Sequence, residues 1–304
     1  MIRYLRHQQI DKKLWDQCID EATDGIIYAY SWYLDLICEG WDALVEDEYT
    51  SVMPVTKGRK YLMDYVYPPF FAQQLGVFSK KPMSNMLSES FLNALPAAFR
   101  YVEMNLHRSN ESIPEGFSKT PKTDLILSMG KDYSTIRKSY SENHLRNIKK
   151  AEKNNLSLFK FGNVNDVIGM FRQHRGRFLA NLQNADYEVF RQLTLSAIKR
   201  NMARVWVVND QYGVPCAAAV FFESHSTGIF VFSATTKKGK ELSAMHFLID
   251  NYIHEFCREL SMLDFEGSND TDLARFYRGF GSTDYVYLQI KKNQLPRPWK
   301  WFKN

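Results

Sequence analysis

The sequence predicts an α+β protein of two domains, residues 1–131 and 132–304, each built on a mixed α/β sheet with flanking helices. Three observations lead to this prediction. The chain has 304 residues, and a single domain typically has ~150 residues. Its composition, 45% hydrophobic and 24% charged, is that of an ordinary globular protein. Short β-rich runs also alternate with amphipathic helical periods, which is typical of mixed sheets covered by helices.

The second half predicts a run of antiparallel strands followed by a β-α-β crossover. The predicted strands are 156–161, 204–208, 215–222, 228–233, 262–266 and 285–290, and the predicted helices are 132–153, 164–173, 185–200, 241–259 and 270–278. The tetrad 210–213 (DQYG) predicts a hairpin turn. Asn154 and Asn155 predict a left-handed end to the helix 132–153, which we expect to continue unbroken through Ser139 and Tyr140.

The first half predicts a looser arrangement of helices and a strand meander. Its predicted helices are 11–22, N-capped by Asp11, a short one starting at Ser31, and 84–98. Its predicted strands are 41–45, 51–56, 61–67, 100–106 and 123–128, with a hairpin turn at 57–60 and a loop over 107–122. We find no sequence repeat between the two halves.

Several features lead us to expect a cytoplasmic protein. The first ten residues are charged and lack the apolar core of a signal peptide, and no stretch approaches ~18 consecutive apolar residues. The four cysteines, which have no close spacing and mostly apolar neighbours, predict reduced core thiols without a disulfide framework or zinc site. They are Cys18, Cys38, Cys216 and Cys257.

The charge balance is mildly basic, with a formal net charge of +5 and a pI near 8.8. This fits an anionic ligand such as a nucleotide cofactor or tRNA. One helical stripe concentrates positive charge on Arg146, Lys149, Lys150 and Lys153. We interpret this stripe either as a contact for tRNA phosphates or as a solvated face that Glu142 and Glu152 neutralise.

The segment 235–243 predicts a turn between a strand and a helix, which would present free backbone N–H groups to an anion. Lys237, Lys238, Gly239 and Lys240 add positive charge and a tight turn. The functional interpretation is a cradle for the phosphates of CoA or of a tRNA end. The structural interpretation is a solvated, lysine-rich turn.

Two acids near the end of the predicted strand 262–266 are candidates for a general base. Asp264 and Glu266 would point to one face of that strand, with Phe265 on the other. A base that accepts a proton from an amine must lie near it and be tuned by partial burial. Glu266 is the better candidate. Asp264 could instead cap the following helix or pair with an arginine.

His246, Asp250 and His254 recur every four residues on the predicted helix 241–259. This spacing can hold a metal ion, but Arg258 continues the same stripe, which a cation site disfavours. We therefore predict a polar outer face and no metal.

Four segments, in this order, resemble the Fem-type branch of the GNAT acyltransferase superfamily, whose members build peptidoglycan cross-bridges. They are 71–77 (FAQQLGV), 145–154 (LRNIKKAEKN), 237–244 (KKGKELSA), and 264–268 (DFEGS) followed by 276–281 (FYRGFG). The resemblance spans residues ~70–290 and implies two tandem GNAT-like domains, each a mostly antiparallel twisted sheet flanked by helices.

The resemblance also implies a direct transfer of an acyl or aminoacyl group to an amine. The donor would be acyl-CoA (acetyl-CoA) or aminoacyl-tRNA, and the acceptor a small-molecule or cell-envelope-precursor amine. The donor would lie on Lys237, Lys238, Gly239, Lys240, Leu242, Ser243 and Ala244, with backbone N–H groups near Phe232 and Ala234 binding the oxyanion. Tyr277 would protonate the leaving group, with Glu266 or Asp264 as base.

Two departures from the family pattern bear on the donor. The phosphate loop keeps only Gly239, and Glu241 would place a carboxylate against a pyrophosphate. Tyr277 lies two residues before Gly279-Phe280, where the family pattern has four. The alternative interpretation is therefore a non-catalytic module that binds an anionic polymer or a partner protein through the basic helix.

Overall fold

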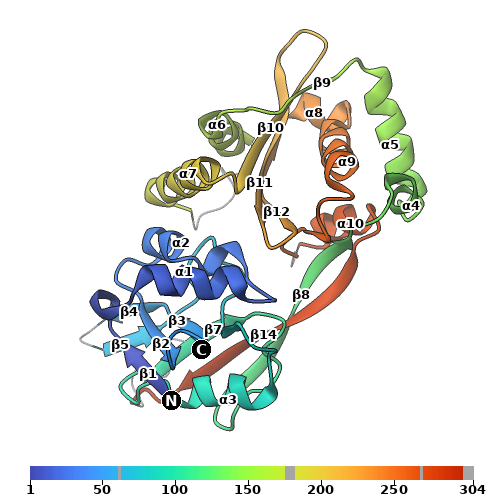
Figure 1. Ribbon diagram of the computed structural model, residues 1–304. Coiled ribbons are helices and arrows are strands. Elements are labelled where there is room, and N and C mark those ends of the chain that lie inside the picture. Colours follow the sequence, from blue (N-terminus) through green and yellow to red (C-terminus); the bar gives the residue numbers. More distant parts are fainter. Residues whose placement is uncertain (61–62, 175–181, 268–269, 297–304) are drawn as a thin grey trace. The chain divides into compact units, whose positions relative to one another are not determined.

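The computed structural model describes residues 1–60, 63–174, 182–267 and 270–296, and the chain divides into two compact units (Figure 1). The first unit is Met1–Lys122 with Val286–Asn304, and the second is Thr123–Tyr285. This division differs from the predicted one, which ended the first domain at residue 131 and gave the whole C-terminal part to the second. The last strand rejoins the first unit because its apolar residue Ile290 is buried in that unit's core.

The first unit contains two sets of strands. One sheet has the order β1-β2-β3-β6, and β4, β5, β7 and β14 follow one another in the second set. The strands are β1 (Ile2–Leu5), β2 (Asp42–Glu46), β3 (Ser51–Val55), β4 (Lys57–Lys60), β5 (Met63–Val66), β6 (Phe78–Ser79), β7 (Tyr101–Leu106) and β14 (Thr283–Asn293). The helices are α1 (Lys12–Glu21), α2 (Ser31–Ile37) and α3 (Asn85–Asn93), with 3-10 turns η1 (His7–Gln9) and η2 (Ile27–Ala29).

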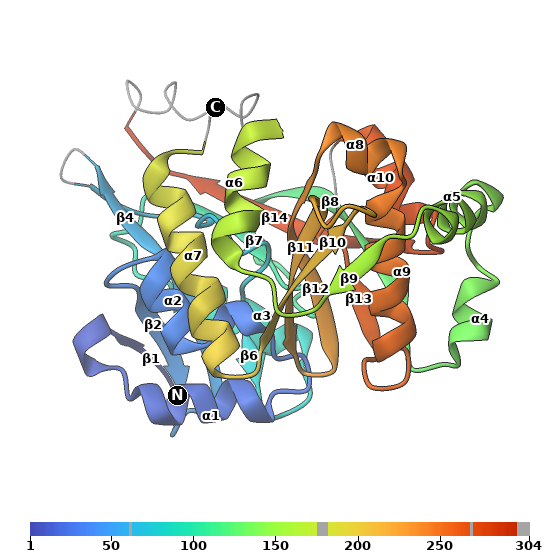
Figure 2. The ribbon, with the colours of Figure 1, turned by 90° about the horizontal axis from the view of Figure 1, so that it is seen from above.

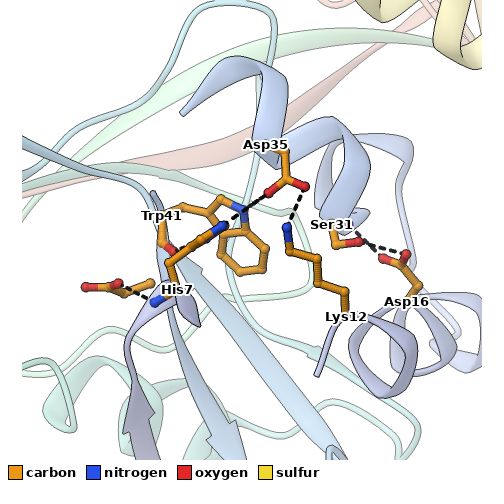
Figure 3. A network of polar contacts seen from close by, with 7 residues as sticks. His7, Lys12, Asp16, Ser31, Asp35 and Trp41 are labelled. Atoms are coloured by element: carbon orange, nitrogen blue, oxygen red, sulfur yellow. Dashed lines mark hydrogen bonds and ion pairs between the residues drawn. The ribbon is translucent and has the colours of Figure 1, made fainter. Parts of the chain in front are cut away.

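A polar network ties the N-terminal segment of this unit to α1, α2 and β2 (Figure 3). The Asp35 carboxylate accepts hydrogen bonds from the Lys12 ammonium at 2.8 Å and from the Trp41 indole at 3.0 Å. His7 Nδ1 lies 2.9 Å from the Trp41 carbonyl oxygen. The predicted Asp11 cap of α1 is confirmed, since its side chain accepts from the N–H groups of Lys13 and Leu14.

The second unit contains the strand order β8-β13-β12-β11-β10-β9. Its strands are β8 (Ser118–Ser128), which enters this unit at Thr123, β9 (Ser157–Phe159), β10 (Ala203–Asn209), β11 (Pro215–Ser224), β12 (Thr227–Thr235) and β13 (Met262–Asp264). Its helices are α4 (Tyr133–Arg137), α5 (Glu142–Lys153), α6 (Val164–His174), α7 (Asn184–Lys199), α8 (Lys237–Glu241), α9 (Ala244–Phe256) and α10 (Thr271–Arg278).

Helices cover both faces of this second sheet. In Figures 1 and 2, α6 and α7 lie on one face, and α9 lies on the other with α5 outside it. The antiparallel run β10-β11-β12 is confirmed. The parallel pair β12-β13, joined through α9, is the predicted β-α-β crossover that follows it. Its core gathers buried residues of the central strands and α9, among them Trp206, Phe221 and Tyr252.

Several predicted boundaries in the first half are wrong. The residues 57–60, predicted as a hairpin turn, form β4, and the predicted strand 61–67 becomes β5; residues 61–62 lie outside the described part. The predicted helix 84–98 ends at Asn93, before Pro96. Part of the predicted loop 107–122 belongs to β8, whose first residues are polar and exposed and therefore resemble a loop in the sequence. The strands β1 and β6 were not predicted.

The predicted single helix 132–153 is two helices. It breaks after α4 because the buried Tyr140 packs edge-on against Phe280, with ring centroids 5.4 Å apart. Ser141 then starts α5 as an N-cap, its hydroxyl accepting from the His144 N–H. The predicted left-handed end at Asn155 is confirmed by its φ of 49°.

Candidate active site

A cleft of about 520 Å³ opens in the second unit where β12 and β13 separate. The two strands pair in parallel only as far as Ile229 and Asp264, where β13 ends. The remainder of β12 continues along β11 without β13 beside it. Residues of α6, β12, α8, α9 and α10 line the cleft. The lining residues that carry charge or can titrate are His174, Lys240, His246, Asp270, Asp272 and Tyr277.

The predicted phosphate loop is the short helix α8 instead of an open turn. Thr236 caps it, with its hydroxyl accepting the Gly239 N–H at 3.0 Å and donating to the Cys216 carbonyl at 3.2 Å. Gly239 is buried, and a Cβ at this position would lie 2.0 Å from that same carbonyl oxygen. The glycine therefore serves close packing of α8 on β11, and its N–H already has an acceptor.

The predicted donor-binding residues separate into two groups. Ala234, Gly239, Lys240 and Ser243 line the cleft. The others, Phe232, Lys237, Lys238, Leu242 and Ala244, are not among its lining residues. Phe232 packs away from the cleft wall formed by α9, with its ring 4.4 Å from Phe171 of α6 and 4.5 Å from Phe190 of α7.

The predicted acids do not line the cleft, and the prediction that both lie in one strand is wrong. The strand ends at Asp264, and Glu266 has a left-handed φ of 57°. Its N–H donates to the buried Asp264 carboxyl at 2.6 Å. Burial, together with the charges of Asp124 and Glu266, raises the pKa of Asp264 well above its usual range. Asp264 therefore accepts a hydrogen bond within this turn, and the roles of Asp264 and Glu266 as bases stay predictions.

Tyr277 does line the cleft, on α10. Its ring stacks on Phe265 with centroids 4.7 Å apart and meets Phe230 edge-on at 6.0 Å. The packing fixes this tyrosine in the wall formed by β12 and α10. Its role as the acid toward a leaving group stays a prediction.

Sequence reasoning missed a second polar element of the cleft. The predicted polar outer face of the helix 241–259 is confirmed for His254 and Arg258, which are exposed. It is wrong for Asp250, which is buried and accepts from the Tyr133 hydroxyl at 2.8 Å, and for His246, which lines the cleft. Among the described residues, no group of His, Cys, Asp and Glu could hold a metal ion. The helical spacing gave no sign of this inward orientation, since the packing partners come from α4, α5 and α10.

The four basic side chains predicted to form a stripe on α5 are exposed. Arg146, Lys149, Lys150 and Lys153 form no ion pair within the described part of the chain, and the nearby Glu152 pairs with Arg137 at 3.8 Å. Asn147 of the same helix accepts a hydrogen bond from Ser243 at 3.1 Å. This bond links α5 directly to the lining of the cleft.

No protein-family model matches the chain, and no curated protein matches its sequence. The solved structure of FemX superposes with a TM-score of 0.71 at 10% identity, covering 99% of both chains. The C-terminal domain of a putative lysylphosphatidylglycerol synthetase from Agrobacterium fabrum gives 0.58 at 10% identity, covering 93% of this chain and 91% of that one.

A third structure, a tandem GNAT protein from the clavulanic acid biosynthesis pathway, gives a TM-score of 0.50 at 10% identity, covering 97% of this chain and 99% of that one. The chain thus has a Fem-type tandem GNAT fold, which confirms the predicted fold class and the resemblance drawn from the sequence. At this level of identity the likeness concerns the fold alone. In the described part of the chain, no helix combines the length and the apolar character needed to cross a membrane.

Proposed function

We propose that the protein is an acyltransferase that moves an acyl or aminoacyl group onto an amine in the cleft of the second unit. The observation that carries this proposal is the separation of β12 from β13, which leaves a cleft beside the part of β12 that β13 does not pair with. A strand edge of this kind can align a carbonyl donor and hold developing negative charge with backbone N–H groups. The structural neighbours FemX and a lysylphosphatidylglycerol synthetase domain support the class of reaction.

Aminoacyl-tRNA is the donor that the site favours over acyl-CoA. A GNAT phosphate loop must offer free N–H groups, whereas the Gly239 N–H is held by Thr236 and the glycine is packed against Cys216. The exposed α5 stripe offers four cations without protein partners among the described residues, and Lys240 stands at the cleft. Positive charge of this kind binds a nucleic-acid backbone.

The acceptor in this proposal is an amine of a cell-envelope precursor, and the reaction takes place in the cytoplasm, where charged tRNA is made. The amine must lose a proton as it attacks the ester. The cleft holds Asp270 and Asp272 on its α10 side, which suits a cationic group awaiting deprotonation. Tyr277 remains our candidate acid for the leaving oxygen, and Glu266 our candidate base from outside the lining.

One set of assays distinguishes acyl-CoA from aminoacyl-tRNA as the donor. Acetyl-CoA, with ADP as control, is expected to leave the unfolding temperature unchanged, whereas a bound ligand at ~100 times its Kd adds ~2.7 kcal/mol. Aminoacylated tRNA is expected to bind with a Kd that weakens steeply with salt, by a slope of about 0.9 per phosphate contacted. Transfer of the labelled amino acid to envelope-precursor amines is then measured directly.

A matched pair of charge reversals locates the binding surface. K149E/K153E on the α5 stripe is expected to weaken tRNA binding at least ~10-fold and to lower the salt slope. K13E/K199E changes the charge equally at exposed lysines of α1 and α7 and is expected to bind like the wild type. Binding without any transfer would instead favour the non-catalytic module. A clear acetyl-CoA shift would overturn the tRNA donor.

A further inference from the structure

We propose that His246 is a neutral hydrogen-bond donor to substrate in this cleft, and that Asn147 and Ser243 are the positioning residues that hold it in that state. The inference rests on the proposed function for its role in transfer, while the state of the ring can be measured without any substrate. It assigns His246 a task other than that of a general base, which is the usual role of a histidine in an acyl-transfer site.

Three side chains from two helices form the relay that sets this state. Ser243, which precedes α9 in a left-handed conformation with a φ of 59°, donates its hydroxyl to Asn147 Oδ1 at 3.1 Å. The Asn147 amide nitrogen lies 3.4 Å from His246 Nε2. In the structure the amide oxygen of Asn147 faces the Ser243 hydroxyl and its NH₂ group faces the imidazole.

An NH₂ group can only donate, so His246 Nε2 must accept. A neutral imidazole whose Nε2 accepts carries its single proton on Nδ1. A protonated ring would place two donors, Nε2–H and the Asn147 NH₂, against each other. The relay therefore selects one tautomer and disfavours the cation.

The surroundings of the His246 ring also favour its neutral form. His144 of α5 and Phe276 of α10 meet the His246 ring edge-on, with centroids 4.6 and 4.9 Å away. Burial, and then the neighbouring His144, lowers the pKa of His246 to about 3. The charged or titratable groups that share the cleft are Lys240 of α8, His174 of α6, and Asp270, Asp272 and Tyr277 of α10.

A ring in this state is a poor proton acceptor near neutral pH, since its only free lone pair is engaged and its conjugate acid is strong. It is a competent hydrogen-bond donor through Nδ1–H, and it donates without bringing a charge into the cleft. A preorganised neutral donor suits an ester carbonyl oxygen that gains negative charge during attack. His246 thereby supplements the backbone N–H groups of the β12 edge.

The first experiment reads the ring directly by ¹⁵N NMR of the full chain, with His246 assigned among the seven histidines by comparison with H246Q. We expect an Nδ1-protonated ring that does not titrate between pH 5 and 8. N147D replaces the donating NH₂ by an accepting carboxylate and is expected to raise the pKa of His246 by about 1–3 and to move the proton to Nε2. N165D, at the exposed start of α6, adds the same charge elsewhere and should change neither.

The second experiment compares two substitutions in the transfer assay. Glutamine at 246 can donate a hydrogen bond but cannot take a proton, whereas leucine can do neither. H246Q is expected to keep the rate within about tenfold of the wild type, and H246L to lose about 10²-fold or more, as when one oxyanion donor is removed. Equal losses in both variants would assign a base and overturn the donor role.

The two experiments fail independently. A wild-type ring protonated on Nε2, or titrating between pH 5 and 8, overturns the relay whatever the activity. An absence of transfer by the wild type with every donor removes the proposed function and the donor role with it. In that case the NMR measurement still decides whether Asn147 holds the ring neutral.

Discussion

The replacement of Gly239 by alanine tests whether this glycine serves packing or phosphate binding. Gly239 lies within the short helix α8, on the buried side that faces β11. An added Cβ would meet the Cys216 carbonyl oxygen at 2.0 Å and its carbon at 2.8 Å. Both atoms belong to the backbone of β11, so no side-chain rotation can relieve the overlap, and α8 itself has to move.

The size of the effect follows from two opposing contributions. Overpacking of a well-filled site costs about 1–3 kcal/mol, and the change from glycine to alanine within a helix returns up to about 1 kcal/mol. We expect a net loss of about 1–2 kcal/mol. For a folding unit of this size, that corresponds to a fall in unfolding temperature of about 2–8 °C.

Gly169 provides the matched control. It lies in the middle of α6, and nothing lies within 4 Å of its added Cβ. The same substitution there is expected to stabilise the protein by up to about 1 kcal/mol. Thermal and urea denaturation of the two variants measure the difference. A Gly239→Ala protein with wild-type stability would refute the packing argument. If in addition the wild type bound acetyl-CoA and this variant did not, the phosphate loop would be restored.

Three further predictions concern stability. Gly279→Ala would place a Cβ 1.9 Å from the His144 ring and is expected to cost about 1–3 kcal/mol, with changed ¹⁵N signals from the displaced ring. Burial raises the pKa of Asp264 in the folded state. The contribution of Asp264 to the free energy of unfolding is therefore complete below the ordinary carboxyl pKa, and it is lost as the pH rises toward the folded-state pKa. Asp264→Asn should flatten this pH dependence, as measured by urea denaturation between pH 5 and 8. Asp42→Ala removes a buried carboxylate that accepts from the His7 N–H and the Lys57 ammonium, and it is expected to lower the free energy of unfolding by about 2–3 kcal/mol. The control is Asp35→Ala, at a carboxylate about 35% exposed, which should lower it by at most about 1 kcal/mol.

Much of the second unit could be predicted because its local patterns are strong. The strands β10, β11 and β12 are apolar runs separated by turn residues, and Asp210 confirms the predicted hairpin by accepting the N–H groups of Tyr212 and Val214. The long α9 follows a helical period whose apolar positions enter the core. In each case the residues of the segment itself suffice to predict whether it is a strand or a helix and which of its side chains are buried.

The features that escaped prediction depend on distant residues. The sequence of β14 does not indicate that its end pairs with β7 in the first unit, since Ile290 and Met104 are far apart in the chain. The break after α4 depends on Phe280, which holds Tyr140 in the core. Local helix propensity alone favours one continuous helix there, and tertiary packing decides otherwise.

The resemblance to the Fem-type branch has a physical basis in how three of its segments meet. Gly279 of the segment 276–281 lies against the ring of His144, next to the start of the segment 145–154. Asn147 in that segment binds Ser243 of the segment 237–244. His246, two residues past that segment, packs against Phe276. Separately each segment is a weak motif, but 237–244 and 276–281 both line the cleft, and 145–154 is joined to that lining through Asn147. A substitution in any of them should therefore be felt at His246, which makes the ¹⁵N signal of that ring a single reporter for all three segments.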